Sequence, residues 1–347
     1  MRKKLLSVVI ANVIGLSGAA SADEFTDFLR QANNGDNLSA SNEGINLSGH
    51  FGSSIEYETK TTTNWGYGEI KEKIITNEIG NVFLNIQDLG LRANYSLKTM
   101  SREQKNYDTS GAKGYYENED SLKHLILLDR PFALSGGWGT GLGYEAEYIT
   151  SEVVSSSANH HEKNSLEQII RPYLTYWNNN YNAGFYASAE YLDLSFDNGS
   201  WGTTDEGGYS LMFKPYKNYG NFQFELELFY QVKDDNETVH AGGVKKYEFT
   251  EKYIQPTIRY SIDNAGLVYL TTRFTKNETT DKGAGPDYFK DVVKTSIGYE
   301  TDLGENWMVK AEYEYTYEKE TTNDPREAGL SKKVDSHKFY AHALYRF

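Results

Sequence analysis

Apolar and polar residues alternate in repeated stretches from Ile45 to the end of the chain, and this period of two constrains the fold most strongly. In Trp307–Tyr317 every odd position is apolar or aromatic, and most even positions are charged. Phe222–Lys233 and Leu91–Lys98 repeat the pattern. A helix would scatter these charges around its axis, whereas a strand sorts them onto one face. The sequence therefore predicts an all-β chain.

The alternation predicts about fourteen strands. Their approximate centres are Phe51, Leu84, Tyr95, Ile126, Ala146, Leu174, Ala187, Leu211, Leu226, Ile258, Leu270, Ile297, Ala311 and Ala343. Short turns alternate with long connections, although Asp129–Gly139 is a longer segment among the short turns. The long polar segments are Thr61–Asn77, Arg102–Asp120, Ser151–Lys163, Asp234–Lys245 and Glu318–Val334. An even number of antiparallel strands with short periplasmic turns and long extracellular loops is the layout of transmembrane up-and-down β-barrels in bacterial outer membranes.

The first residues have the pattern of an export signal. Met1–Lys4 is cationic, Leu5–Leu16 is an apolar run too short to span a bilayer, and Ala20–Ala22 offers small residues for cleavage. The predicted organisation is a signal peptide at residues 1–22, a polar periplasmic leader at 23–44 and an outer-membrane β-barrel at 45–347.

Composition excludes several other classes of protein. The net charge is −14, and residues 1–22 carry basic but no acidic side chains, so the exported chain is more acidic still and an unsuitable partner for nucleic acid. The absence of cysteine excludes disulfides and thiolate metal sites. A mean hydropathy of −0.65 and no long apolar run exclude a helical membrane protein. The 28 tyrosines and 16 phenylalanines suit a surface that is apolar in the middle and meets water at its edges.

A soluble β-sandwich is the main structural alternative, because it also combines alternation with tight turns. Two features argue against it. Several strands place aromatic residues at the ends of the apolar face and small residues between them, as in Phe339–Phe347. The opposite face carries charges near the middle of many strands, and a filled sandwich core would bury these unpaired.

The last three residues, Tyr345-Arg346-Phe347, end an alternating strand and resemble the terminal signal that the outer-membrane assembly machinery reads in Gram-negative porins. With the strand count and the tyrosine-rich strands, the whole exported chain resembles the monomeric porin G family and the related small porins for oligogalacturonate and cyclodextrin. This resemblance implies a monomeric channel that is non-selective or prefers saccharides. It rests on layout and on the terminal motif, so it assigns no pore residues.

The strand phase itself predicts the residues of the lumen. About fourteen strands spaced by about 4.8 Å and tilted by about 40° give a backbone radius of about 14 Å, which side chains would narrow to roughly the width of a sugar. The inward charged groups proposed to line the pore are Arg92, Lys98, Glu145, Glu147, Arg171, Glu190, Lys214, Glu225, Glu227, Arg259, Arg273, Lys294, Lys310, Glu312 and Glu314. Complementary inward pairs would favour a closed barrel, and zones of like charge an open one.

Inward tyrosines offer a second set of candidates: Tyr173, Tyr186, Tyr253, Tyr269 and Tyr340. Their rings could stack on sugars, although they would equally fill the lumen.

Enzymatic barrels require a catalytic constellation at the rim. Asp335-Ser336-His337 supplies the residue types of a hydrolase, but it shows only neighbours in sequence. His160-His161 has no partner at metal-ligand spacing, and adjacent residues of an extended chain point in opposite directions. We therefore predict no enzyme, no metal and no cofactor.

The leading hypothesis is a passive diffusion channel for small hydrophilic solutes, oligosaccharides among them. The alternatives are a closed or adhesive barrel that binds surface ligands through its loops, and a rim-active hydrolase. The expected partners are outer-membrane lipid and lipopolysaccharide, the assembly machinery and the solutes themselves. The expected oligomeric state is a monomer.

Overall fold

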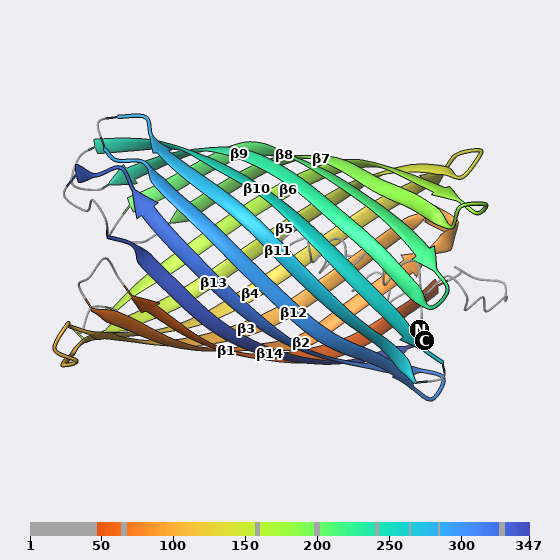
Figure 1. The fold of residues 1–347 in the computed structure, drawn as a ribbon, viewed down its shortest axis with the longest axis horizontal. Coiled ribbons are helices and arrows are strands. Elements are labelled where there is room, and N and C mark those ends of the chain that lie inside the picture. The colour runs from red at the N-terminus through yellow and green to blue at the C-terminus, as the bar shows by residue number, and fades with distance from the viewer. Residues whose placement is uncertain are drawn as a thin grey trace, which may run out of the picture.

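The chain forms a closed antiparallel barrel in which each strand pairs with its sequence neighbours and β1 pairs with β14. In this computed structural model the described residues are 47–63, 68–156, 160–197, 202–239, 243–263, 265–283, 285–325 and 330–347. Turns connect the strands at both ends of the barrel, and the C-terminus lies at the right-hand end in Figure 1. We call this the terminal end and the opposite one the distal end. The predicted signal peptide and leader lie outside the described residues.

The described part of the chain contains fourteen strands, and every predicted centre lies within one of them. The strands are β1 (Leu47–Thr63), β2 (Glu69–Ile86), β3 (Leu91–Tyr107), β4 (Lys113–Ala133), β5 (Trp138–Ser155), β6 (His160–Asn178), β7 (Ala183–Asp197), β8 (Gly202–Tyr219), β9 (Phe222–Val239), β10 (Gly243–Ile262), β11 (Gly266–Asp281), β12 (Tyr288–Leu303), β13 (Trp307–Thr322) and β14 (Lys332–Arg346). A single 3-10 turn, Gln87–Leu89, connects β2 to β3. No helix in the described residues is long and apolar enough to cross a membrane.

The predicted long loops are wrong in extent, because most of their residues belong to strands. Arg102–Asp120, for example, is strand except for residues 108–112. Within that turn the Asp108 carboxylate accepts hydrogen bonds from the Ser110 hydroxyl at 2.6 Å and the Ala112 amide at 3.0 Å, and these lower its pKa. β4 has 21 residues, about twice what a tilted strand needs to cross a bilayer. The barrel wall therefore continues well beyond the lipid at the distal end.

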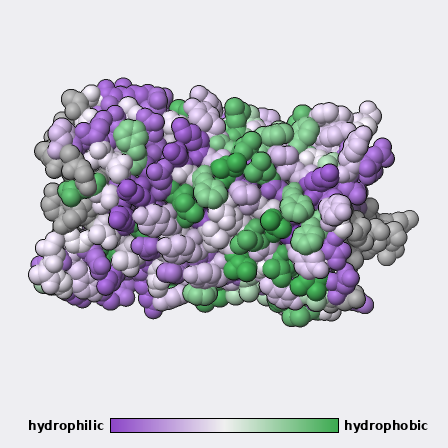
Figure 2. Space-filling model, in the orientation of Figure 1, coloured by the Kyte–Doolittle hydropathy of each residue, from purple (hydrophilic) through white to green (hydrophobic). Residues whose placement is uncertain are grey.

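The outer surface shows where the lipid lies. Exposed apolar side chains such as Leu211, Phe274 and Ile297 alternate along their strands with residues that face the interior. On the face seen in Figure 2, hydrophobic residues gather over the middle and terminal part of the barrel, while hydrophilic residues dominate the distal end. Outside the lipid both faces of a strand meet water, so the hydrophobic alternation fades there.

The ladder between β1 and β14 closes the barrel, and its hydrogen bonds extend to the last residue. The Phe347 amide donates to the Gly49 carbonyl at 3.0 Å, and the Gly49 amide donates to the Phe347 carbonyl at 3.2 Å. A Cβ on Gly49 would lie 2.2 Å from the Phe83 carbonyl oxygen, so only glycine fits this close approach between β1 and β2.

Candidate functional site in the barrel interior

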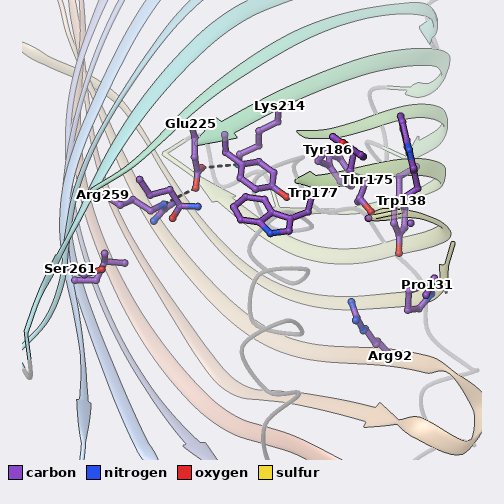
Figure 3. A pocket seen from close by; sticks show the side chains of 18 of the residues that line it. Arg92, Pro131, Trp138, Thr175, Trp177, Tyr186, Lys214, Glu225, Arg259 and Ser261 are labelled. Carbon is purple, nitrogen blue, oxygen red and sulfur yellow. Dashed lines mark hydrogen bonds and ion pairs between the residues drawn. The ribbon is translucent and has the colours of Figure 1, made fainter. Parts of the chain in front are cut away.

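A cavity of about 940 Å³ occupies the terminal half of the interior. Its lining comes from strands on all sides of the barrel, including Arg92 of β3, Lys214 of β8 and Arg259 of β10. Figure 3 shows Lys214, Glu225 and Arg259 linked on one wall, with Tyr186, Trp177 and Trp138 on the next. The barrel interior is therefore a hollow with polar and aromatic walls.

The strand register places all fifteen predicted pore residues on the interior side of the wall. They are Arg92 and Lys98 on β3, Glu145 and Glu147 on β5, Arg171 on β6, Glu190 on β7, Lys214 on β8, Glu225 and Glu227 on β9, Arg259 on β10, Arg273 on β11, Lys294 on β12, and Lys310, Glu312 and Glu314 on β13. A shared face does not mean equal access, however, because these side chains fall into groups with different burial.

The first group is a sealed ion cluster on β5–β7. The Arg171 guanidinium donates to Glu145 at 2.8 Å and also to Glu190. The side chains of Arg171, Glu145 and Glu190 are only 1%, 0% and 4% exposed, and the Ser210 hydroxyl donates to Glu190. Three charges buried this completely hold neighbouring strands together and offer little to a solute.

The second group joins β8, β9 and β10 beside the cavity. The Lys214 ammonium lies 3.4 Å from Glu225 and 3.2 Å from Glu227, and the Arg259 Nε donates to Glu225 at 3.0 Å. Glu225 thus bridges two cations, as Figure 3 shows. The positive charges are neutralised locally, although Lys214 and Arg259 still line the cavity.

The third group combines cations with tyrosine rings on β10–β14. Arg273 lies 4.1 Å from the ring centroid of Tyr253, and Lys310 lies 5.5 Å from that of Tyr269 and 5.3 Å from that of Tyr340. The Tyr253 hydroxyl donates to Glu227 at 2.5 Å, and the Tyr269 hydroxyl donates to Glu312. We call Tyr253, Tyr269, Arg273, Lys310 and Tyr340 the cation–tyrosine belt.

Glycines on adjacent strands let two of the tyrosines lie flat on the wall. A Cβ on Gly298 would lie 2.1 Å from the Tyr269 ring, and one on Gly141 would lie 2.3 Å from the Tyr173 ring. A side chain at either position would push the ring towards the lumen. Tyr173 and Tyr186 then approach to 5.5 Å between ring centroids, while Phe229 and Tyr253 stack at 4.6 Å.

Other inward charges form ion pairs as well. Glu147 pairs with Lys123, Lys294 lies 3.1 Å from Glu314, and Lys310 lies 3.4 Å from Glu312. Lys98 faces Lys123 across the β3–β4 ladder. Apart from such like-charged neighbours, most inward charges in the described residues lie next to a residue of opposite charge.

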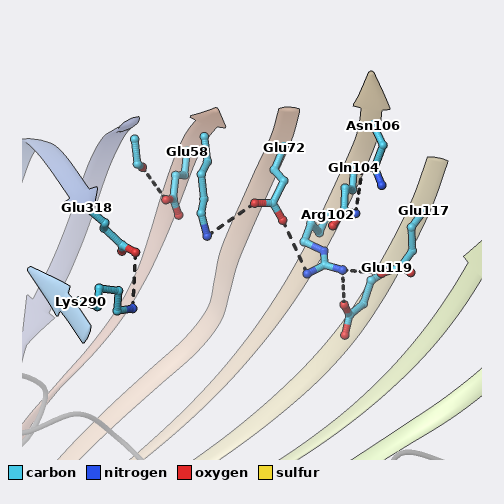
Figure 4. Close-up of polar contacts among 11 residues, drawn as sticks. Glu58, Glu72, Arg102, Gln104, Asn106, Glu117, Glu119, Lys290 and Glu318 are labelled. Atoms are coloured by element: carbon cyan, nitrogen blue, oxygen red, sulfur yellow. Dashed lines mark hydrogen bonds and ion pairs between the residues drawn. The ribbon is translucent and has the colours of Figure 1, made fainter. Parts of the chain in front are cut away.

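Sequence reasoning missed two interior sites. Arg102 lies 2.5 Å from Glu117, 3.3 Å from Glu119 and 3.7 Å from Glu72 (Figure 4), but its segment was predicted to be a loop. Asp129, which is fully buried and lies 3.7 Å from Arg92, was assigned to a connection. Alternation carried no signal for Arg102, because the distal part of β3 around it is polar on both faces.

The catalytic and metal candidates do not converge. Ser336 faces inward and donates to Glu58 at 2.5 Å, whereas His337 faces outward, with its Nδ1 2.8 Å from the Tyr313 hydroxyl. Asp335 also faces outward and accepts a hydrogen bond from Tyr315 at 2.8 Å. Among the described residues, no group of three or more histidine, aspartate and glutamate side chains is arranged to hold a metal ion.

The fold, the lipid-facing band and the hollow interior together define a membrane-spanning barrel of the channel-forming class. The family model described as "CymA: Putative cyclodextrin porin" matches residues 1–347, so the chain belongs to this family. Family and fold place it in the bacterial outer membrane, in contact with lipid, as a passive channel for small solutes. The predicted resemblance to cyclodextrin porins is confirmed, whereas the resemblance to the porin G family stays a prediction.

Two solved structures match the chain at low identity, and the first shares its fold. The chain is similar to the deltaS2 mutant of the TodX monoaromatic hydrocarbon channel, with 10% identity, a TM-score of 0.51, and coverage of 89% of this chain and 92% of that one. It also matches an outer membrane channel from Pseudomonas putida F1, with 11% identity, a TM-score of 0.47, and coverage of 90% and 98%. No curated protein sequence matches the chain significantly. These likenesses concern the fold alone.

Proposed function

We propose that this channel passes neutral hydrophilic solutes of saccharide size, as a monomer and without catalysing a reaction. The observation that carries the proposal is the cavity of about 940 Å³, whose lining sets the stacked rings of Trp177 and Tyr216, 5.6 Å apart between centroids, beside Lys214. Flat rings beside polar groups suit the mixed apolar and hydroxylated faces of a sugar. The family description, which names cyclodextrin, supports the same class of solute.

Paired charges favour neutral solutes over ions. Lys214 and Arg259 share Glu225, so an approaching anion meets a dipolar group and no free positive charge. Complementary charge pairs would also be expected in a closed barrel. The cavity of about 940 Å³ is the feature that favours an open channel. We keep the fifteen charged residues as proposed pore residues, with Lys294 at 31% and Glu312 at 19% side-chain exposure among the more accessible.

Conductance of the refolded full-length protein in planar bilayers tests this proposal. Neutral cyclic and linear glucose oligomers should block the current reversibly, and more strongly than oligogalacturonates of the same length. Trp177→Leu should weaken the block, whereas Trp177→Phe, which keeps an aromatic ring, should largely retain it. Folded protein that never conducts would overturn the channel and favour the closed barrel; block by charged oligomers alone would overturn the neutral solute.

A further inference from the structure

A row of exposed charged residues crosses five strands on the outside of the barrel. Cross-strand register pairs Lys252 of β10 with Lys276 of β11, Lys276 with Asp291 of β12, Asp291 with Lys319 of β13, and Lys319 with Lys333 of β14. All five side chains are exposed, and the next residues along these strands face the interior. We call these residues the lysine row; it holds four cations and one carboxylate, and the outward carboxylates Glu278 and Asp335 lie two residues away along β11 and β14.

The lysine row contains two like-charged cross-strand pairs, Lys252 with Lys276 and Lys319 with Lys333. Residues directly opposite on antiparallel strands have Cβ atoms about 5 Å apart, and like charges there destabilise a sheet. Within the lysine row, the one ion pair joins Lys276 to Asp291 at 3.8 Å, between side chains that are 73% and 69% exposed. A bound anion would remove this repulsion.

Another outward lysine pair shows the contrast. Lys71 and Lys105 also face each other, across β2 and β3. Each has its own carboxylate, with Lys71 3.2 Å from Glu69 and Lys105 2.5 Å from Glu103. Among the described residues, Lys252, Lys319 and Lys333 lie within ion-pair distance of no carboxylate.

The lysine row lies directly above lipid-facing residues. One outward step towards the terminal end, the register joins Ile254, Phe274 and Val293, which are 42%, 50% and 38% exposed, then Tyr317, and ends at the exposed Asp335 on β14. This is the side of the barrel nearest the viewer in Figure 1, and Figure 2 shows the apolar band giving way to hydrophilic residues towards the distal end. An amphiphile with acyl chains on the apolar row would place its headgroup on the lysines.

The opposite side of the barrel has the reverse charge. There the register joins Asp120 of β4, Glu152 of β5 and Glu162 of β6, all outward and exposed. An anionic headgroup would be repelled from that side, so a single charge-complementary face remains.

We propose that the lysine row binds the phosphate groups of lipopolysaccharide, with the acyl chains on the apolar row below. Phosphate monoesters carry the charge that four lysines neutralise, and lysine binds phosphate as a compact point charge. The distal location fits the outer leaflet, and the proposal is independent of what passes through the lumen.

The experiment measures the unfolding midpoint of the full-length protein in zwitterionic micelles, by the shift in gel mobility between folded and unfolded barrels. The added probes are purified diphosphoryl lipid A and the same lipid after removal of both phosphates. The diphosphoryl form should raise the midpoint by about 3 °C or more, and the dephosphorylated form by much less. Raising salt from about 0.05 to about 0.5 M should reduce the difference between them.

The informative variant carries Lys252→Gln, Lys276→Gln, Lys319→Gln and Lys333→Gln, and the matched control carries Lys71→Gln and Lys105→Gln. The quadruple variant should lose most of the response to phosphate, yet unfold without lipid at the same temperature as the parent or higher, because the repulsion is gone. The control should keep the response. Equal shifts with both probes, an undiminished response in the quadruple variant, or an equal loss in the control would each overturn the proposal.

Discussion

Two parts of the inner wall carry the same kinds of residue but differ in what those residues can do. On β5–β7, Arg171 is held between Glu145 and Glu190 with 1% of its side chain exposed. On β12 and β13, Lys294 and Glu312 keep 31% and 19% exposure. The first region uses charge to fasten strands, and the second presents charge beside tyrosine rings. Facing inward is therefore a property of strand phase, whereas access to a solute depends on the neighbours across the ladder.

The largest expected effect comes from breaking the sealed cluster. Arg171→Leu leaves Glu145 and Glu190 buried without their cation, so it should lower the free energy of unfolding by about 3–5 kcal/mol. Denaturant titration of the refolded barrel measures this. Lys294→Gln on β12 serves as the control and should lose much less, because Glu314 keeps a second cation, Lys338, at 3.8 Å. Equal losses in the two variants would erase the distinction between the regions.

The next effect tests the phase of β13, which carries Lys310 of the belt. Ala311 is exposed to lipid, so Ala311→Arg should cost about 2–4 kcal/mol in bilayers. Glu312→Arg, on the lumen side, should change stability less. A reversed order in a lipid-based unfolding assay would mean that the strand is shifted by one residue.

A smaller effect is expected where a ring is pressed against the wall. Gly298→Ala would set a methyl group 2.1 Å from the present position of the Tyr269 ring, so the ring must move towards the lumen. We expect a destabilisation of about 1–3 kcal/mol and a lower single-channel conductance. If the double variant Gly298→Ala/Tyr269→Ala conducts no better than Gly298→Ala alone, the displaced ring is not the obstruction.

The smallest effect concerns ion selectivity. Neutralising Arg92, Arg259 and Arg273 with glutamine should leave Asp129 and Glu225 less compensated and shift the reversal potential modestly towards cation selectivity, since paired charges and salt screening limit the field. The outward change Lys252→Gln is the control and should leave the reversal potential unmoved. An unaltered reversal potential in the conducting triple variant would contradict the assignment of these arginines to the pore.

The sequence was sufficient for the number of strands and for their phase, because each lipid-facing strand must alternate. It was insufficient for the distal extensions, where residues such as Arg102 and Glu103 are polar on both faces and hide the period of two. It also could not show that Arg171 meets Glu190, since that contact depends on the register between β6 and β7 and on side-chain packing. The interior face was thus predictable, while its division into sealed and accessible groups was not.

The pairing of β1 with β14, which ends at Gly49 and Phe347, affects how the barrel folds. Its hydrogen bonds join residues separated by nearly the whole barrel sequence, so closing this ladder carries the largest loop entropy of any strand pair. Every other pair is a local hairpin that can form as soon as its two strands exist. Closure is therefore expected to be the last and slowest step of folding, and until β14 pairs with β1 the sheet keeps two open edges that can pair with other chains.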